Sequence, residues 1–145
     1  MLLVKTSNGV VEQYPYTISD LYHDNPHTSF PKTVSKDALA NYSVYEVTPT
    51  TRPEYNHLVQ SVVCNSEPHV ESGEWVIGYT VENKTQDLAE TNVRNYRSNL
   101  LSKTDWMATT DNTMTTAMAE YRQALRDITS QEGFPYDVTW PTKPE

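Results

Sequence analysis

The chain has 145 residues, with 19 acidic side chains against 11 Lys and Arg, and its formal net charge is -8. Both parts share the acidic excess: residues 1–84 carry 10 acids and 5 bases, and residues 85–145 carry 9 acids and 6 bases. Neither part offers the basic surface that binds a phosphate backbone, so the composition argues against a nucleic-acid partner. The length predicts one domain or two small ones.

The cysteine content and the hydropathy of the chain indicate the cellular compartment in which the protein is expected. Cys64 is the only cysteine, so no intramolecular disulfide can form, which fits a reducing compartment. The apolar run of residues 2–4 is too short for the core of a signal peptide. No stretch approaches the roughly 20 apolar residues that a membrane helix needs. We therefore expect a soluble intracellular protein without a membrane partner.

A β-hairpin is predicted at the start of the chain. Runs rich in strand-forming residues flank Asn8-Gly9 and together span residues 2–16. This dipeptide is a strong hairpin signal because both central positions of the turn require positive φ. Residues 2–16 are therefore expected to form two paired strands.

The segment Tyr14–Lys32 contains three prolines, Pro15, Pro26 and Pro31, and predicts little regular structure. Ser and Thr residues in this segment and just after it can cap short helical turns by accepting hydrogen bonds from backbone N–H groups. Two such turns are expected: residues 18–23, capped by Thr17 or Ser19, and residues 35–39, capped by Ser35.

Three further strands are predicted from alternating apolar and polar residues: 42–48, 58–65 and 74–83. The segment Glu71–Glu74 is expected to form the turn between the last two. Short strands with little helix indicate a small antiparallel, sandwich-like β domain over residues 1–84. Its tyrosines and any exposed sheet edge make this domain the candidate for recognition of a particular partner.

The hydrophobic period changes from strand to helix after Asn83. A first helix is predicted from the narrow stripe of Ala89, Val93, Tyr96 and Leu100, with Thr85 or Asn83 as its cap. A second helix follows a polar connection, with Asp111 or Thr113 as its cap. Its expected apolar face comprises Met114, Ala117, Met118, Tyr121, Leu125 and Ile128.

The end of the second helix carries a stop signal. Gly133 can take the left-handed conformation of a C′ residue, and Pro135 prevents the helix from resuming. An extended tail rich in proline and tryptophan then follows. The complete prediction is an α+β chain: a β domain, then a helical hairpin with its tail over residues 85–145.

Three groups of side chains could in principle carry chemistry, but the sequence favours none of them as a catalytic or metal site. His23 and His27 could share a metal only on a helix, which Pro26 interrupts. Cys64 beside His57 or His69 is more typical of a small core residue than of a nucleophile. The acidic cluster of Glu67, Glu71 and Glu74 is typical of a solvated loop. We expect no enzyme, no cofactor and no metal site.

The sequences LLSKTDW, YRQALRDIT and GFPYDVTWP follow one another in the C-terminal part of the chain. Over about Arg94 to Pro141 they resemble the bacteriophage tail fibre assembly chaperones, and the polar run of residues 108–116 departs from the family pattern. The residues that match in order are Leu100, Leu101, Asp105, Trp106, Tyr121, Arg122, Leu125, Arg126, Asp127, Pro135, Val138, Trp140 and Pro141. The segments YPYTISDLYHDNPHTSFP, YSVYEVTPT and GEWVIGYTV show a weaker similarity to fibre-associated phage proteins.

The resemblance implies a function and a partner. Such chaperones bind the distal part of a trimeric tail fibre and assist its folding and trimerisation in the cytoplasm of the host. Unassembled fibre chains expose apolar surface and strand edges, which are aggregation hazards. Three copies per fibre and self-association are the expected assembly. The alternative is a structural virion component, a fibre-tip or adaptor protein that stays on the particle.

The predicted partner-binding residues all lie in the helical part. Arg122 and Arg126 flank the apolar stripe of the second helix. They either lie on a solvated helix edge or contact another chain. The aromatic residues can either fill the core of the helical unit or anchor a partner. The predicted set is Trp106, Tyr121, Arg122, Leu125, Arg126, Phe134 and Trp140.

Overall fold

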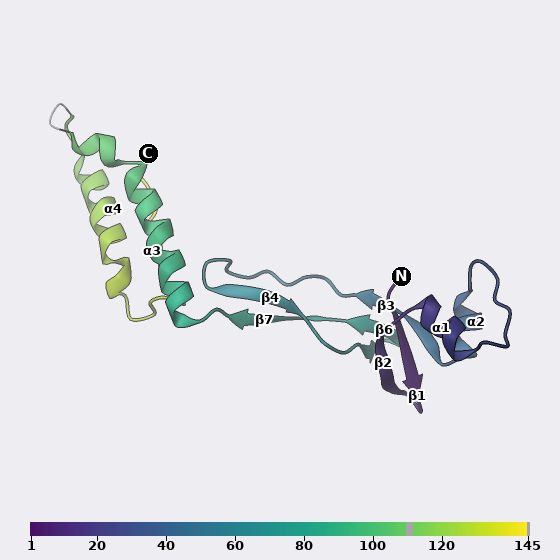
Figure 1. Ribbon diagram of the computed structural model, residues 1–145. Helices are drawn as coiled ribbons and strands as arrows, with labels where there is room; N and C mark the ends of the chain where they lie inside the picture. Colours follow the sequence, from purple (N-terminus) through teal and green to yellow (C-terminus); the bar gives the residue numbers. More distant parts are fainter. Residues whose placement is uncertain (110–111, 145) are drawn as a thin grey trace. The chain divides into compact units, whose positions relative to one another are not determined.

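The computed structural model describes residues 1–109 and 112–144. The chain forms two compact units: residues 1–53 with 62–80, and residues 54–61 with 81–145. A two-stranded sheet of β4 (Gln60–Cys64) and β7 (Tyr79–Asn83) contributes residues to both units. The predicted α+β class is confirmed, because strands dominate the first unit and helices the second (Figure 1).

The first unit contains a curled five-stranded sheet with the strand order β2-β1-β3-β6-β5. Three of its pairings are antiparallel, but β3 and β6 run parallel. The prediction of an antiparallel, sandwich-like domain is therefore wrong in this respect, because β6 enters beside β3 only after a long excursion of the chain. The strands are β1 (Leu3–Ser7), β2 (Val10–Tyr16), β3 (Val44–Pro49), β5 (His69–Glu71) and β6 (Glu74–Ile77).

The predicted N-terminal hairpin is confirmed. β1 and β2 pair with each other, and the turn between them places Asn8 at φ 52° and Gly9 at φ 79°. Positive φ at both central positions matches the right-handed twist of the flanking strands. The hairpin forms one edge of the sheet.

The two predicted helical turns are also confirmed. In α1 (Ile18–Asp24), the Thr17 hydroxyl accepts a bond from the Asp20 amide, and the Asp20 carboxylate accepts one from the Thr17 amide at 2.8 Å. In α2 (Lys36–Ala40), the Ser35 hydroxyl accepts from the amide of Ala38. Local capping therefore sets both helix starts.

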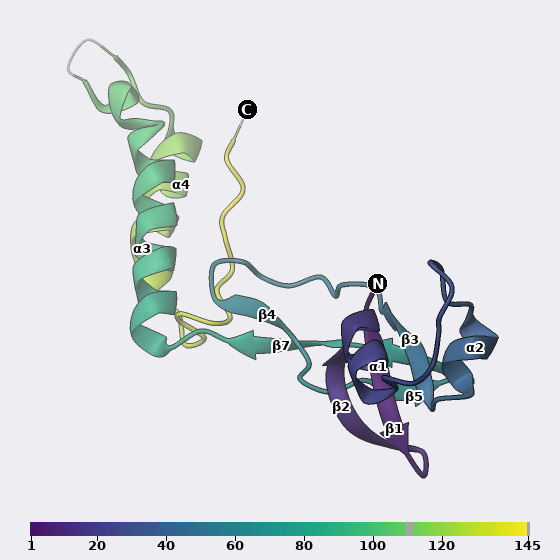
Figure 2. The ribbon, with the colours of Figure 1, turned by 45° about the vertical axis from the view of Figure 1, so that its right-hand side comes forward.

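Both helices pack on one face of the sheet, and α1 lies against the β1–β2 hairpin (Figure 2). Side chains alternate between faces along a strand, so neighbours in β1 enter different clusters. Leu3 faces the helices, whereas Val4 joins Val47 and Ile77 on the opposite face. The cluster under the helices comprises Leu3, Tyr16, Leu21, Val34, Leu39 and Val44.

The predicted strand over residues 74–83 is divided in two. β6 ends at Ile77 and β7 begins at Tyr79, and a Cβ at the intervening Gly78 would lie 3.2 Å from the side-chain amide of Asn65. The predicted turn at Glu71–Glu74 exists, but it joins β6 to the short strand β5, which the sequence did not indicate. The alternation pattern therefore found the strand but missed the change of partner at Gly78.

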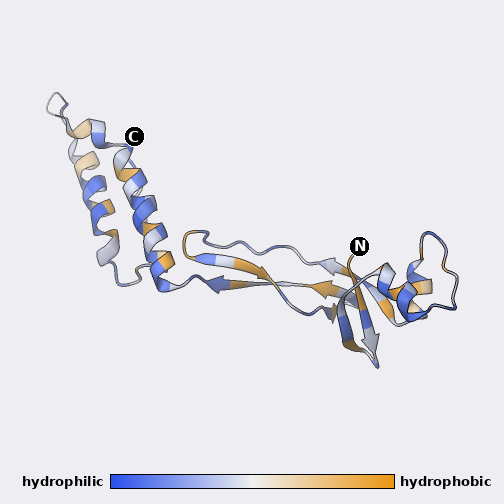
Figure 3. Ribbon diagram, viewed as in Figure 1, coloured by the Kyte–Doolittle hydropathy of each residue, from blue (hydrophilic) through white to orange (hydrophobic). Residues whose placement is uncertain are grey.

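Among its described residues, the second unit contains four helical segments, and α3 lies beside α4 (Figure 1). Hydrophobic residues recur at intervals along both, as expected of amphipathic helices (Figure 3). The segments are α3 (Gln86–Ser102), η1 (Asp105–Ala108), α4 (Thr116–Arg126) and η2 (Asp127–Ser130).

The caps of the two long helices differ from the prediction in detail. Thr85 stands at the N-cap of α3, as one of the two predicted residues, but its side chain makes no capping hydrogen bond. Thr115 caps α4 by accepting a bond from the amide of Met118, so the expectation of Thr113 is wrong. The alternative, Asp111, lies outside the described residues.

The predicted role of Gly133 is also wrong. Its φ is not positive, and α4 ends earlier, at Arg126, continuing into η2. Glycine is needed here for a close backbone approach: a Cβ would lie 2.0 Å from the carbonyl oxygen of Asp137. The Asp137 amide donates to the Gly133 carbonyl at 2.7 Å, which closes the turn after the helix.

Candidate partner-binding surface

The facing sides of α3 and α4 enclose an apolar cluster. Met118, Tyr121 and Leu125 of α4 are buried at the spacing expected for one helix face. Leu100 and Leu101 of α3 pack against them, as do Met107, Met114 and Trp140. Leu101 lies off the predicted stripe of its helix and finds its partners in this cluster. The packing fixes the helical framework from which other side chains project.

A buried arginine joins the two helices. The guanidinium of Arg122 donates to the carbonyl of Leu101 at 3.0 Å, to the hydroxyl of Thr104, and to the carboxylate of Asp105 at 2.8 Å. Thr104 is itself buried. Because a buried polar group is costly unless its hydrogen bonds are satisfied, this set of bonds holds the end of α3 against α4.

The tail also packs against a second apolar cluster of the helical unit. Phe134, Val138 and Trp140 pack against a buried cluster centred on Val93 and Ile128. The amide of Thr139 donates to the side-chain oxygen of Gln131 at 2.7 Å, and the Gln131 amide group donates back to the Thr139 carbonyl at 2.9 Å. The tail is therefore part of the folded unit.

Two aromatic side chains of the tail also contact the surface of α3. Arg94 lies over the Phe134 ring at 5.2 Å, and Tyr96 meets Trp140 edge to face at 4.8 Å between ring centroids. Arg94 also pairs with Glu90 at 2.6 Å. Hydrogen bonds from Gln86 and then Arg94 lower the pKa of Glu90 below its ordinary value. These contacts hold Phe134 and Trp140 half-buried.

The seven predicted partner-binding residues fall into three groups. Tyr121, Arg122 and Leu125 are buried inside the helical unit, and Phe134 and Trp140 are half-buried under the contacts just described. Trp106, with 58% of its surface exposed, and Arg126 project into solvent. Partner binding stays a prediction for all seven, and these last two are the most accessible.

Two neighbouring hollows lie on this helical unit beside the exposed pair. The first, of about 190 Å³, is lined by Trp106 and three methionines together with polar residues of the connection before α4. The second, of about 420 Å³, is lined by α4 and Ala108 and includes Arg126. Met114 belongs to both linings. The surface thus combines apolar side chains with one accessible cation.

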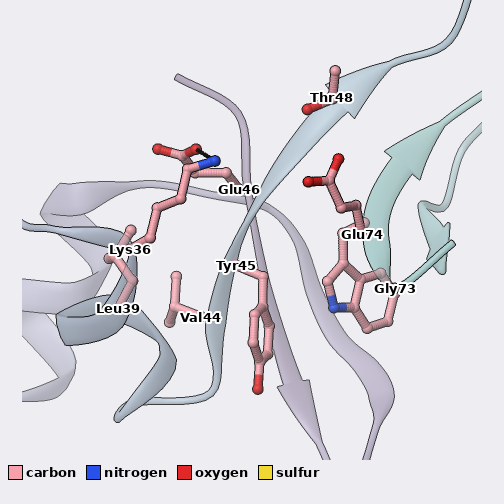
Figure 4. Close-up of a pocket in the computed structure, with 9 residues that line it drawn as sticks. Lys36, Leu39, Val44, Tyr45, Glu46, Thr48, Gly73 and Glu74 are labelled. Atoms are coloured by element: carbon pink, nitrogen blue, oxygen red, sulfur yellow. Dashed lines mark ion pairs between the residues drawn. The ribbon is translucent and has the colours of Figure 1, made fainter. Parts of the chain in front are cut away.

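The first unit has its own hollow, of about 150 Å³, beside the start of β6 (Figure 4). Tyr45 and Trp75 stack beside it, with 6.3 Å between their ring centroids. Lys36 and Glu46 form an ion pair at 2.9 Å on its wall, marked in Figure 4. The pKa of Lys36 is raised chiefly by its hydrogen bond to Glu46. Its lining mixes aromatic and paired charged groups.

The described part of the chain shows no group of three or more His, Cys, Asp or Glu side chains that could hold a metal ion. Cys64 is a free, exposed thiol and not the small core residue that was expected. None of the described helices is both long and apolar enough to span a bilayer.

One structural contribution to the helical unit comes from residues that precede its helices in the sequence and was not predicted. Leu58 and Val59, predicted only as part of a strand, pack against Ala89, Val93 and Ile128. The side-chain amide of Asn92 donates to the Leu58 carbonyl at 2.7 Å. The available signal was the adjacent apolar pair Leu58-Val59, but Ala89 lies 30 residues after Val59 and Ile128 lies 69 residues after it.

The helical unit is an amphipathic two-helix module with a packed tail and apolar hollows on its surface. Residues 90–145 match the model of the family described as phage tail assembly chaperone protein. This match confirms the resemblance for the C-terminal part of the chain and supports a role in phage tail assembly. No curated protein and no solved structure matches the chain significantly.

Proposed function

We propose that this protein is a chaperone that binds the distal part of a phage tail fibre and assists its folding and trimerisation. The observation that carries the proposal is the match of residues 90–145 to the tail assembly chaperone family. The whole helical framework from η1 onward lies inside this match. On this account the protein acts in the cytoplasm of the host, without enzymatic chemistry.

The surface of the helical unit is suited to this task. A chaperone of this kind covers apolar segments of an unassembled chain, which would otherwise aggregate. It therefore needs accessible apolar side chains on a stable support. The hollows beside Trp106 provide accessible apolar groups, and the buried cluster around Leu125 provides the support.

The β-rich first unit is the proposed source of specificity for one fibre. Its hollow presents Tyr45 and Trp75, and aromatic residues are frequent anchors in protein interfaces. The helical unit would then supply general binding of the unassembled chain. Three copies per trimeric fibre are the expected assembly.

Co-expression with the tail fibre gene of the same phage tests the proposal. The measured quantity is the yield of soluble, trimeric fibre with and without this protein. The proposal predicts a clear rise in yield when the protein is present. Equal yields would refute it. Protein mass spectrometry of purified particles then distinguishes a chaperone that leaves from a virion component present in stoichiometric amounts.

A further inference from the structure

Three of the four methionines of the chain gather around the most exposed tryptophan. Met107, Met114 and Met118 line the hollow of about 190 Å³ together with Trp106. Met107 and Met114 are half-buried, so their side chains are accessible from this hollow. Methionine is flexible and polarizable, and it adapts to apolar partners of differing shape. Such a cluster favours binding of several related apolar segments.

The two arginines beside the methionine cluster differ in whether they are free to bind an acidic group of a partner. Arg122 lines the adjoining hollow but is neutralised by Asp105, at 2.8 Å. Arg126 lines the same hollow, is exposed, and forms no ion pair with any of the residues that the structure describes. Glu120 also contributes to this lining. A single carboxylate placed against Arg126 is therefore favoured, whereas a run of acids would be repelled by Glu120.

We infer that Trp106, Met107, Met114 and Arg126 form the client groove of the module. Its occupant is an apolar segment of the fibre polypeptide that carries one carboxylate beside its apolar side chains. This inference rests on the proposed function and specifies the part of the client that is bound. Apolar side chains of the segment enter the methionine hollow, and its carboxylate meets the Arg126 guanidinium.

The position and charge of the groove argue for this occupant. All four residues lie within the part that matches the chaperone family, so the groove belongs to the module associated with tail assembly. A second copy of the chain is a poorer occupant, because each copy has a net charge of -8 and the copies repel each other at close range. An unfolded fibre segment can instead present apolar residues with a single acid.

Methyl NMR on the full-length protein tests the inference directly. The protein is labelled with ¹³C at the methionine methyl groups, and the probes are overlapping synthetic peptides that cover the fibre protein of the same phage. The binding peptides are expected to shift the signals of Met107 and Met114 but not that of Met1. Replacing the carboxylate of a binding peptide by its amide is expected to weaken binding about tenfold.

Matched variants distinguish a loss of binding at the groove from the effect of substituting any exposed residue. Trp106→Ala and Met114→Gln should each weaken peptide binding about tenfold, whereas Leu88→Gln, an exposed apolar residue of α3, should not. Arg126→Glu should remove the preference for the carboxylate, and the control Lys143→Glu should retain it. Methyl spectra of the free variants verify that each one is folded.

The outcomes distinguish this inference from the proposed function. If the protein raises the yield of trimeric fibre but all groove variants do so equally well, the groove is overturned and the function stands. Methionine shifts that appear only on raising the protein concentration would assign the groove to a second copy, which also overturns the inference. If the unchanged protein gives no rise in fibre yield, the proposed function itself fails.

Discussion

Arg122 illustrates how a charged side chain can serve the interior of a small helical unit. Its three hydrogen-bond acceptors are Leu101 at the end of α3, Thr104 just before η1, and Asp105 at the start of η1, and Thr104 is buried. The guanidinium therefore connects segments that are 17 to 21 residues apart in the sequence. Arg126, one turn later on α4, is exposed and offers a natural comparison.

Replacing Arg122 by methionine should destabilise the helical unit by about 2 kcal/mol, because the buried Thr104 hydroxyl loses its donor. Arg126→Met should change the free energy of unfolding by less than about 0.5 kcal/mol, as an exposed substitution. Urea unfolding followed by helical circular dichroism measures both. Equal effects of the two substitutions would contradict the structural role of Arg122.

A charged group in the first unit gives stability a dependence on pH. The Asp24 carboxylate accepts hydrogen bonds from the Lys5 ammonium at 2.8 Å and from the Tyr16 hydroxyl at 2.9 Å. The bond from Lys5, and then that from Tyr16, hold the pKa of Asp24 below its ordinary value. A lowered pKa means that folding stabilises the charged carboxylate, and protonation removes that stabilisation.

The contribution of Asp24 should be complete above its unfolded pKa of about 4 and should be lost as the pH falls through the lower folded value. Asp24→Asn should therefore lower the melting temperature at pH 7, and this difference should shrink as the pH falls below about 4. Lys5→Met should act similarly, and the double variant should add little to either single one. Thermal unfolding as a function of pH checks this; additive effects would rule out the pairing.

Gly133 is required for space rather than for left-handed geometry. Gly133→Ala should destabilise the second unit by about 2 kcal/mol, because the new Cβ would collide with the Asp137 backbone at 2.0 Å. Glu132→Ala, at the exposed neighbouring position, is the control and should be nearly neutral. Calorimetric melting of both variants decides the matter, and a neutral Gly133→Ala would refute the steric argument.

At the scale of elements, the turn that leads into strand β4 stabilises the helices. Val59, which directly precedes β4, is 2% exposed within the cluster formed with α3 and η2, whereas Val63, inside β4, is 45% exposed. Val59→Ala should lower the stability of the helical unit by about 2 kcal/mol, and Val63→Ala should have little effect. Urea unfolding monitored by helical signal provides the test. Similar effects of the two would show that Val59 does not support the helices.

The local elements could be predicted because their causes are local. Asn8-Gly9 required a hairpin turn, Thr17 and Ser35 supplied helix caps, and the apolar spacing around Leu125 indicated a helix face. Each of these signals depends on residues within a few positions of one another. The sequence resemblance in the C-terminal part needs no knowledge of contacts either, and the family match confirms it.

The features that were missed depend on contacts between distant residues. The parallel pairing of β3 with β6 follows from the route of the chain, which strand propensity does not report. The burial of Arg122 depends on acceptors in another helix. The need for Gly133 has a local cause, the turn to Asp137, but it was missed because glycine also suits the left-handed end of a helix. Exposure of Trp106 likewise could not be predicted, because an aromatic residue fits a core or a surface equally well.

At the scale of the molecule, the two units have different structural character. The first is a curled sheet covered by α1 and α2, and the second is a helical module in which residues 54–61 take part. Only part of the second unit, within residues 90–145, matches the chaperone family. The proposed division assigns fibre recognition to the first unit and binding of unassembled chains to the second.

The most direct test of the central claim is the mass of the complex formed with the tail fibre of the same phage. The purified full-length protein is mixed with fibre produced in its presence, and light scattering after size exclusion gives the mass. The account predicts a complex of one trimeric fibre with this protein bound, at three copies per fibre. Separate elution of a fibre and of this protein, with no shared complex at any stage of assembly, would contradict it.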